Sequence, residues 1–180
     1  MKTYLLSFGV AIFFVIVIIV LGSLFLNSSA GIEVVKVDLP DPILTPGSID
    51  LAVTPDNVKE TVCVRGYASD RRPSNSDSLK NQVIERYNYK GNKSDVILDH
   101  LIPISLGGSP DSLTNLWLQP KDEATMKDKL ELALYYYICQ DVMGLRTAQN
   151  YLVPNWYYTY KQSKIEEETL GIEIVDPDDL

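Results

Sequence analysis

The feature that most constrains this chain is a stretch of 23 residues, 4–26, without a single charged side chain. As a helix it would be about 34 Å long, and the hydrocarbon core of a bilayer is roughly 30 Å thick. We therefore expect residues 1–27 to form a transmembrane anchor. A cleavable signal peptide is the alternative, because the small residues Ser28 and Ala30 precede Gly31 in the pattern of a cleavage site.

Both interpretations place residues 31–180 on the extracytoplasmic side of a membrane. Lys2 is the only basic residue before Lys36, and acidic residues dominate the region just after the apolar stretch. The protein is then anchored by a single N-terminal span, or secreted if the segment is cleaved.

The composition fits one modest globular domain with accessory segments. The chain has 180 residues, of which 46% are hydrophobic and 22% charged, so it has enough apolar side chains to bury a core. Two cysteines and one histidine are too few for a disulfide-rich miniprotein or a four-cysteine zinc site.

The net charge of −8 argues against a nucleic-acid partner. The charge is unevenly distributed along the chain, however, so each segment must be considered separately. Residues 59–164 hold 14 Lys and Arg against 12 Asp and Glu, whereas the last 16 residues hold seven acids and no base. The middle of the chain is therefore mildly basic, and we expect it to bind a polyanion in a modest, salt-sensitive way.

The exported part divides into three segments. Residues 28–58 include three prolines between positions 40 and 46 with little periodicity, so we interpret them as an extracytoplasmic spacer. Residues 59–162 form the expected folded domain, and residues 163–180 an acidic C-terminal tail.

Within the domain, hydrophobic periodicity predicts an α+β fold. The expected elements are a capped helix of about eleven residues beginning at Ser76, a strand at 95–98, a glycine-containing turn at 107–111, a strand at 115–119, a helix from Asp122 to Cys139 and a helix at 145–153.

The polar residues that interrupt this pattern suit the hydrolysis of a phosphodiester bond. That reaction needs a base for the attacking water and a cation to neutralise the charge that builds on the phosphate. His100 can be the base, and Asp99 beside it offers an oxygen ligand that suits Mg²⁺. A further ligand must come from the next helix, where Asp128 is the preferred candidate and Glu131 the next.

Each of these residues also has a purely structural interpretation. A lone histidine is often only a bonded structural group, although its context here favours chemistry. Asn115 is a candidate catalytic residue, but it is better suited to bond the backbone of the long loop and so hold the strand of His100. Asp128 and Glu131 can equally pair with neighbouring lysines or solvent.

The motifs Asp99-His100-Leu101-Ile102-Pro103, Gly107-Gly108 and Asn115-Leu116-Trp117 resemble those of the HNH endonucleases, which have the ββα-metal fold. The resemblance is closer to an exported bacterial branch, covers about residues 44–158, and includes Arg71-Arg72-Pro73 and Lys127-Asp128-Lys129-Leu130-Glu131. It implies an HNH-like nuclease core with extra helices, a general base at His100 and a metal ligand at Asp99. This chain departs from the commonest pattern, since its helix lacks the final His or Asn.

Together these features predict a metal-dependent endonuclease that cleaves DNA, with RNA as the alternative substrate and Mg²⁺, or else Mn²⁺, as the cofactor. Arg71 and Arg72 are the expected phosphate ligands, because one guanidinium group can donate two parallel hydrogen bonds to phosphate oxygens. Lys127 adds a third cation. The alternative for the arginines is an exposed loop pair. The alternative for the protein is a non-catalytic exported binding module that keeps the fold.

We also predict a disulfide between Cys63 and Cys139. Export places both cysteines in an oxidising compartment, where an even pair tends to be bonded. The alternative is two separate buried thiols.

Overall fold

The structure is a computed structural model that describes residues 38–170, with side chains up to residue 166. Its elements in chain order are η1 (Pro55–Glu60), α2 (Tyr67–Asp70), α3 (Ser76–Arg86), β1 (Val96–His100), η2 (Ile104–Leu106), β2 (Leu116–Pro120), α4 (Lys121–Cys139), α5 (Leu145–Leu152) and α6 (Trp156–Leu170). In this part of the chain no helix has the length and apolar character needed to cross a bilayer. The predicted membrane segment at 4–26 lies outside the described residues.

The centre of the domain is a two-stranded antiparallel hairpin followed directly by a long helix. Asp99 on β1 is paired with Trp117 on β2, and His100 with Leu116. Because successive residues of a strand point to opposite faces, Asp99 and His100 belong to different faces of the hairpin. The predicted α+β class is confirmed, with the order strand, loop, strand, helix.

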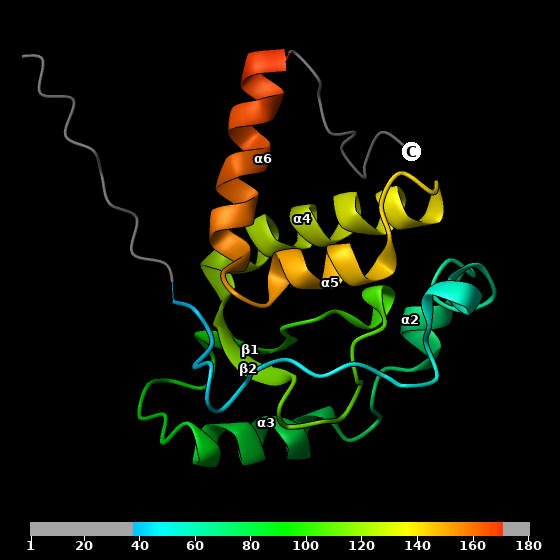
Figure 1. Ribbon diagram of the computed structural model, residues 1–180. Coiled ribbons are helices and arrows are strands. Elements are labelled where there is room, and N and C mark those ends of the chain that lie inside the picture. Colours follow the sequence, from blue (N-terminus) through cyan, green and yellow to red (C-terminus); the bar gives the residue numbers. More distant parts are fainter. Residues whose placement is uncertain (1–37, 171–180) are drawn as a thin grey trace, which may run out of the picture. The chain divides into compact units, whose positions relative to one another are not determined.

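Helix α3 covers one face of the hairpin (Figure 1). Leu79 and Val83 of α3 form a small core with alternate residues of the strands, namely Val96, Leu116 and Leu118. Val83 and Leu116 are completely buried.

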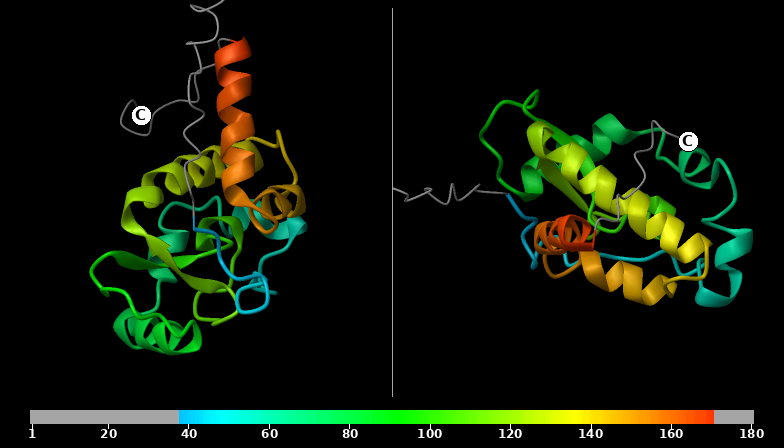
Figure 2. Two further views of the ribbon diagram at one scale, coloured as in Figure 1. Left: turned by 90° about the vertical axis from the view of Figure 1, so that its left-hand side faces the viewer. Right: turned by 90° about the horizontal axis from the view of Figure 1, so that it is seen from above.

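The other face of the hairpin carries the larger core, with α4, α5 and α6 on that side of the sheet (Figures 1 and 2). Trp117 of β2 belongs to this core together with Leu130 and Leu134 of α4. Trp156 at the start of α6 belongs to the same cluster and is fully buried. Helix α4 is therefore fixed against the strands that carry the candidate site.

The predicted helices and strands are present, with small shifts at their ends. The helix expected at Ser76 has the predicted eleven residues, but its N-cap position is Asn75 and no side chain caps it. The first strand extends to His100, so the Asp-His pair lies within β1 rather than after it. Asp122 lies in the first turn of α4 rather than capping it.

Two segments differ from the expectation. Part of the predicted spacer packs into the domain, since Thr45 and Val53 are each only 1% exposed and Val53 belongs to the large core. Helix α6 was not predicted, and it continues into the segment interpreted as an acidic tail. Asn155 marks its start, because its Oδ1 accepts a hydrogen bond from the Tyr158 backbone N–H at 2.9 Å.

The predicted disulfide is confirmed. Cys63 and Cys139 are bonded, with their Cα atoms 5.6 Å apart. The bond joins the segment that follows η1 to the last residue of α4.

Candidate active site

His100 lies at the end of β1, and its ring faces the loop that connects the two strands. Its Nε2 atom is 2.7 Å from the Pro110 carbonyl oxygen. A carbonyl oxygen can only accept a hydrogen bond, so Nε2 carries the proton and the lone pair of the neutral ring is on Nδ1. The ring therefore has one fixed tautomer with a basic nitrogen on the other side.

Burial keeps this histidine neutral. It lowers the pKa of His100 below the ordinary value of 6.5, and the positive charges of Lys127 and Arg72 act in the same direction. The bond to Pro110 and the charge of Asp99 oppose the shift without reversing it. At neutral pH the ring is thus in the form that can accept a proton.

Asn115 holds the loop between the strands through its side-chain amide. Its Oδ1 accepts a hydrogen bond from the Ile102 N–H at 3.0 Å, and its Nδ2 donates to the carbonyl oxygens of Ile102 at 2.8 Å and Ser109 at 3.0 Å. The side chain is completely buried. Of the two predicted roles for Asn115, this arrangement supports the positioning role.

The loop geometry explains why positions 107 and 108 are both glycine. A Cβ atom on Gly108 would lie 1.8 Å from the Ile102 carbonyl oxygen and 2.9 Å from Asn115 Nδ2. Gly107 has a φ of +74°, a conformation that favours glycine. The loop can close on Asn115 only because both residues lack a side chain.

Lys127 of α4 is the centre of a buried ionic cluster on the opposite face of the hairpin. Its Nζ is 2.7 Å from Asp99 Oδ2, forms an ion pair with Glu131 one turn later on α4, and donates to the His100 carbonyl oxygen at 2.7 Å. The Lys127 side chain is 1% exposed. Trp117 Nε1 also donates to Asp99 Oδ2, at 3.2 Å.

The cluster keeps Lys127 charged. Burial alone would lower the pKa of Lys127, but the charges and hydrogen bonds of Asp99 and Glu131 raise it above its ordinary value. For Glu131, burial raises the pKa against the opposing charge of Lys127. The ammonium group is therefore the stable positive charge of this cluster.

The predicted phosphate ligands are separated by the fold. Lys127 lies inside the domain, contrary to the expectation of an accessible cation, because two carboxylates and a carbonyl bind its ammonium group. Arg71 is 3.9 Å from an Asp50 carboxylate oxygen and stacks 4.4 Å above the Tyr67 ring. Arg72 is exposed, and its positive charge contributes to the low pKa of His100. For Asp128, burial raises the pKa, and the charge of Arg72 only opposes that shift.

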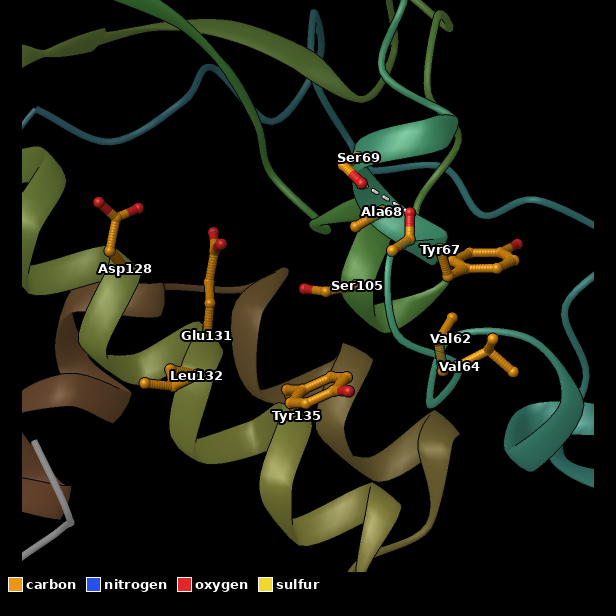
Figure 3. Close-up of a pocket in the computed structure, with 11 residues that line it drawn as sticks. Val62, Val64, Tyr67, Ala68, Ser69, Ser105, Asp128, Glu131, Leu132 and Tyr135 are labelled. Carbon is orange, nitrogen blue, oxygen red and sulfur yellow. Dashed lines mark hydrogen bonds between the residues drawn. The ribbon is translucent and has the colours of Figure 1, made fainter. Parts of the chain in front are cut away.

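A cavity of about 350 Å³ lies beside the cluster, where α4 faces α2 and η2. Asp128 and Glu131 project into it from neighbouring turns of α4 (Figure 3). The rest of its wall consists of Val62, Val64, Gly66, Tyr67, Ala68, Ser69, Ser105, Leu132 and Tyr135. Two carboxylates and mainly apolar walls make this cavity unsuitable for a phosphate group.

The three predicted metal ligands are not gathered around a common point for an ion. Asp99 and Glu131 both bind the Lys127 ammonium, whereas Asp128 is exposed and lines the cavity. Within residues 38–166, no three His, Cys, Asp or Glu side chains lie in an arrangement that could hold a metal ion. As they are arranged, these residues do not fit a divalent ion.

Two contributors to the site were not identified from the sequence. Trp117 binds Asp99 because the two residues are paired across the strands, and Pro110 orients the imidazole. The spacing of Lys127 and Glu131, four residues apart on one helix, was a readable signal for their ion pair.

Comparison with known proteins gives no matching family model, no matching curated protein and no matching solved structure. The resemblance to HNH endonucleases therefore rests on the sequence motifs.

Proposed function

We propose that the domain is an HNH-like endonuclease that hydrolyses phosphodiester bonds of DNA on the extracytoplasmic side of a membrane. The observation that carries the proposal is the state of His100. Its ring is half-buried, fixed through Nε2 by the Pro110 carbonyl oxygen, and held neutral by burial. These are the properties of a general base at neutral pH.

In the proposed reaction, His100 Nδ1 accepts a proton from the attacking water. The new oxygen–phosphorus bond forms as the bond to the leaving oxygen breaks, and negative charge builds on the phosphate. Arg72 is the exposed cation whose charge reaches His100, so we assign it to the phosphate. Asn115 and Gly108 act indirectly, by holding the loop that positions the imidazole.

Dependence on Mg²⁺, or on Mn²⁺ instead, remains a prediction from the sequence. The carboxylates expected to hold the ion are bound to Lys127, and we assign no step of the reaction to a metal.

A plasmid-nicking assay on the full chain in detergent micelles tests the proposal, with Mg²⁺, Mn²⁺ or EDTA present. His100→Ala should lower the rate by about 10²–10⁴-fold, because the base is lost. Near-normal nicking by a correctly folded His100→Ala variant would remove His100 from the mechanism. Arg72→Ala should weaken substrate binding, because Arg72 is assigned to the phosphate. Its control is Arg65→Ala, which removes the same charge from another exposed residue.

The second candidate is a non-catalytic module that binds a polyanion. The pairing of Asp99 and Glu131 with Lys127 favours it, because these contacts hold α4 against β1 and leave the carboxylates bound to a buried lysine. Salt-sensitive DNA binding without nicking under any of the three conditions would support this candidate over the nuclease.

A further inference from the structure

We infer that the Lys127 ammonium group is the resident cation of the Asp99–Glu131 pair and occupies the position in which a divalent metal ion would otherwise bind. This concerns cation binding, so it does not require the proposed cleavage. Only the activity measurement described last depends on the proposed function.

The coordination of the ammonium group is the first argument. An ammonium has three N–H donors, and Lys127 Nζ has three oxygen partners: Asp99 Oδ2, a Glu131 carboxylate oxygen and the His100 carbonyl oxygen. The three oxygens come from a β1 side chain, an α4 side chain and the β1 backbone. No N–H of Lys127 remains to be satisfied by water or substrate.

Competition for the same oxygens is the second argument. Mg²⁺ and Mn²⁺ bind carboxylate oxygens directly, and an ion at this position would need the oxygens that Lys127 already uses. Asp99 Oδ2 also accepts a hydrogen bond from Trp117. The ion would in addition lie next to a buried positive charge, which is strongly unfavourable where there is little water to screen it.

Burial is the third argument. The Lys127 side chain is 1% exposed, against 19% for Asp99 and 17% for Glu131. If Lys127 lost these partners to a metal ion, a charged group would remain unpaired inside the protein. The ion in solution must therefore displace a buried cation that is attached to the chain.

The inference predicts that replacing Lys127 creates a binding site for a divalent ion. Lys127→Ala removes the charge and leaves space, and two carboxylates then lie close together in a partly buried place without a counter-ion. Such a pair should recruit a divalent ion. Lys129→Ala is the matched control, because it removes the same charge from an exposed position two residues away on α4.

The two tryptophans of the chain provide a local probe, which is needed because the acidic C-terminal residues can bind Mn²⁺ on their own. The indole N–H of Trp117 contacts Asp99, whereas Trp156 lies in the core and its Nε1 has no hydrogen-bond partner within the described part of the chain. Paramagnetic Mn²⁺ at the Asp99–Glu131 pair would broaden the NMR signal of Trp117 before that of Trp156, because the broadening falls steeply with distance and the Trp117 indole contacts Asp99 directly. The experiment uses the full chain labelled with ¹⁵N-tryptophan in detergent micelles, with signals assigned from Trp156→Phe.

In the wild type and in Lys129→Ala, added Mn²⁺ should leave the Trp117 signal as sharp as that of Trp156. In Lys127→Ala, the Trp117 signal should broaden ahead of the Trp156 signal at substoichiometric Mn²⁺, and Lys127→Ala/Glu131→Gln should abolish this difference. Selective loss of the Trp117 signal in the wild type would overturn the inference, as would an unaffected Trp117 signal in a folded Lys127→Ala variant. The wild-type titration decides the matter even if Lys127→Ala does not fold.

The activity measurement distinguishes this inference from the proposed function. If the wild type nicks DNA, EDTA cannot remove the Lys127 ammonium group, because it is part of the chain, so the Asp99–Glu131 pair keeps its cation whether or not the rate changes. Abolition of nicking by EDTA would leave the nuclease proposal in place and show that a metal ion is required, and Mn²⁺ binding at the Asp99–Glu131 pair in the wild-type NMR titration would then overturn the inference. Absence of nicking under all conditions would overturn the nuclease proposal, while the NMR titration would still test the inference.

Discussion

The two nitrogens of His100 have different tasks, and this difference predicts the pH dependence of cleavage. Only the neutral ring can accept a proton, and burial lowers the pKa of His100 below 6.5. The rate should therefore rise with pH, with a midpoint below 6.5, and be level by neutral pH. The pH profile of kcat/KM for plasmid nicking measures this midpoint, and a midpoint clearly above 6.5 would contradict the assigned environment of the ring.

The position of Arg72 leads to a second prediction about the pH profile of kcat/KM. Its charge contributes to the low pKa of His100, so Arg72→Ala should move the midpoint to higher pH as well as weaken substrate binding. Arg65→Ala should leave the midpoint unchanged. A loss of activity in Arg72→Ala without any displacement of the midpoint would indicate that Arg72 acts only on the substrate, far from the base.

Asn115 is the polar residue on which the loop most depends. Asn115→Ala would leave the Ile102 N–H and the carbonyl oxygens of Ile102 and Ser109 without their buried partner. We expect a loss of roughly 2–4 kcal/mol of unfolding free energy from these unsatisfied groups. Thermal unfolding followed by circular dichroism measures it, with Asn81→Ala as the control, because Asn81 forms an exposed hydrogen bond to Lys93. Equal stability of the two variants would contradict this role.

At the scale of elements, the loop between β1 and β2 is the part most sensitive to volume. Gly108→Ala would drive a methyl group into the Ile102 carbonyl, so the backbone must move and unfolding should become easier by about 3 kcal/mol or more. Gly144→Ala is the matched control, since a Cβ atom there would have no neighbour within 4 Å among the residues that the structure describes. Comparable melting temperatures for the two variants would show that the loop tolerates the displacement.

The elements also show what the sequence can reveal and what it cannot. Strong periodicity located α3 and α4, and the turn residues located the hairpin, because these signals are local. Helix α6 was missed because Pro154 indicated only the end of the preceding helix, although Asn155 caps the next one. The position of Lys127 could not be predicted either, since its burial depends on how α4 packs against β1.

At the scale of the whole molecule, the net charge of −8 does not show where the individual charged groups lie. The titratable groups of the hairpin are divided between its two faces. His100 turns to the loop, and Asp99 turns to Lys127 and Trp117. The sequence drew attention to Asp99 and His100 together because they are adjacent in the chain, but it did not identify Trp117 or Pro110 as their partners. The division of Asp99 and His100 between two faces follows from strand alternation and became clear only with the register of the hairpin.

The disulfide is the covalent feature that ties this arrangement together. Cys63 and Cys139 are 76 residues apart, and the chain between them includes α3, the hairpin and α4. Opening so long a loop should cost roughly 4 kcal/mol of unfolding free energy in the chain-entropy description. Lys59 offers only partial compensation, because its contacts with the Cys139 carbonyl oxygen and Asp141 are exposed.

Reduction and substitution should therefore have the same effect on stability. A reductant should lower the melting temperature of the wild type to that of Cys63→Ala/Cys139→Ala and leave the double variant unchanged. Because the bond joins the end of α4 to the segment after η1, the reduced protein should also lose protection against amide hydrogen exchange in the last turns of α4 first. If the reductant frees both thiols, as alkylation would show, and the wild type melts as before, the bond is not a significant source of stability.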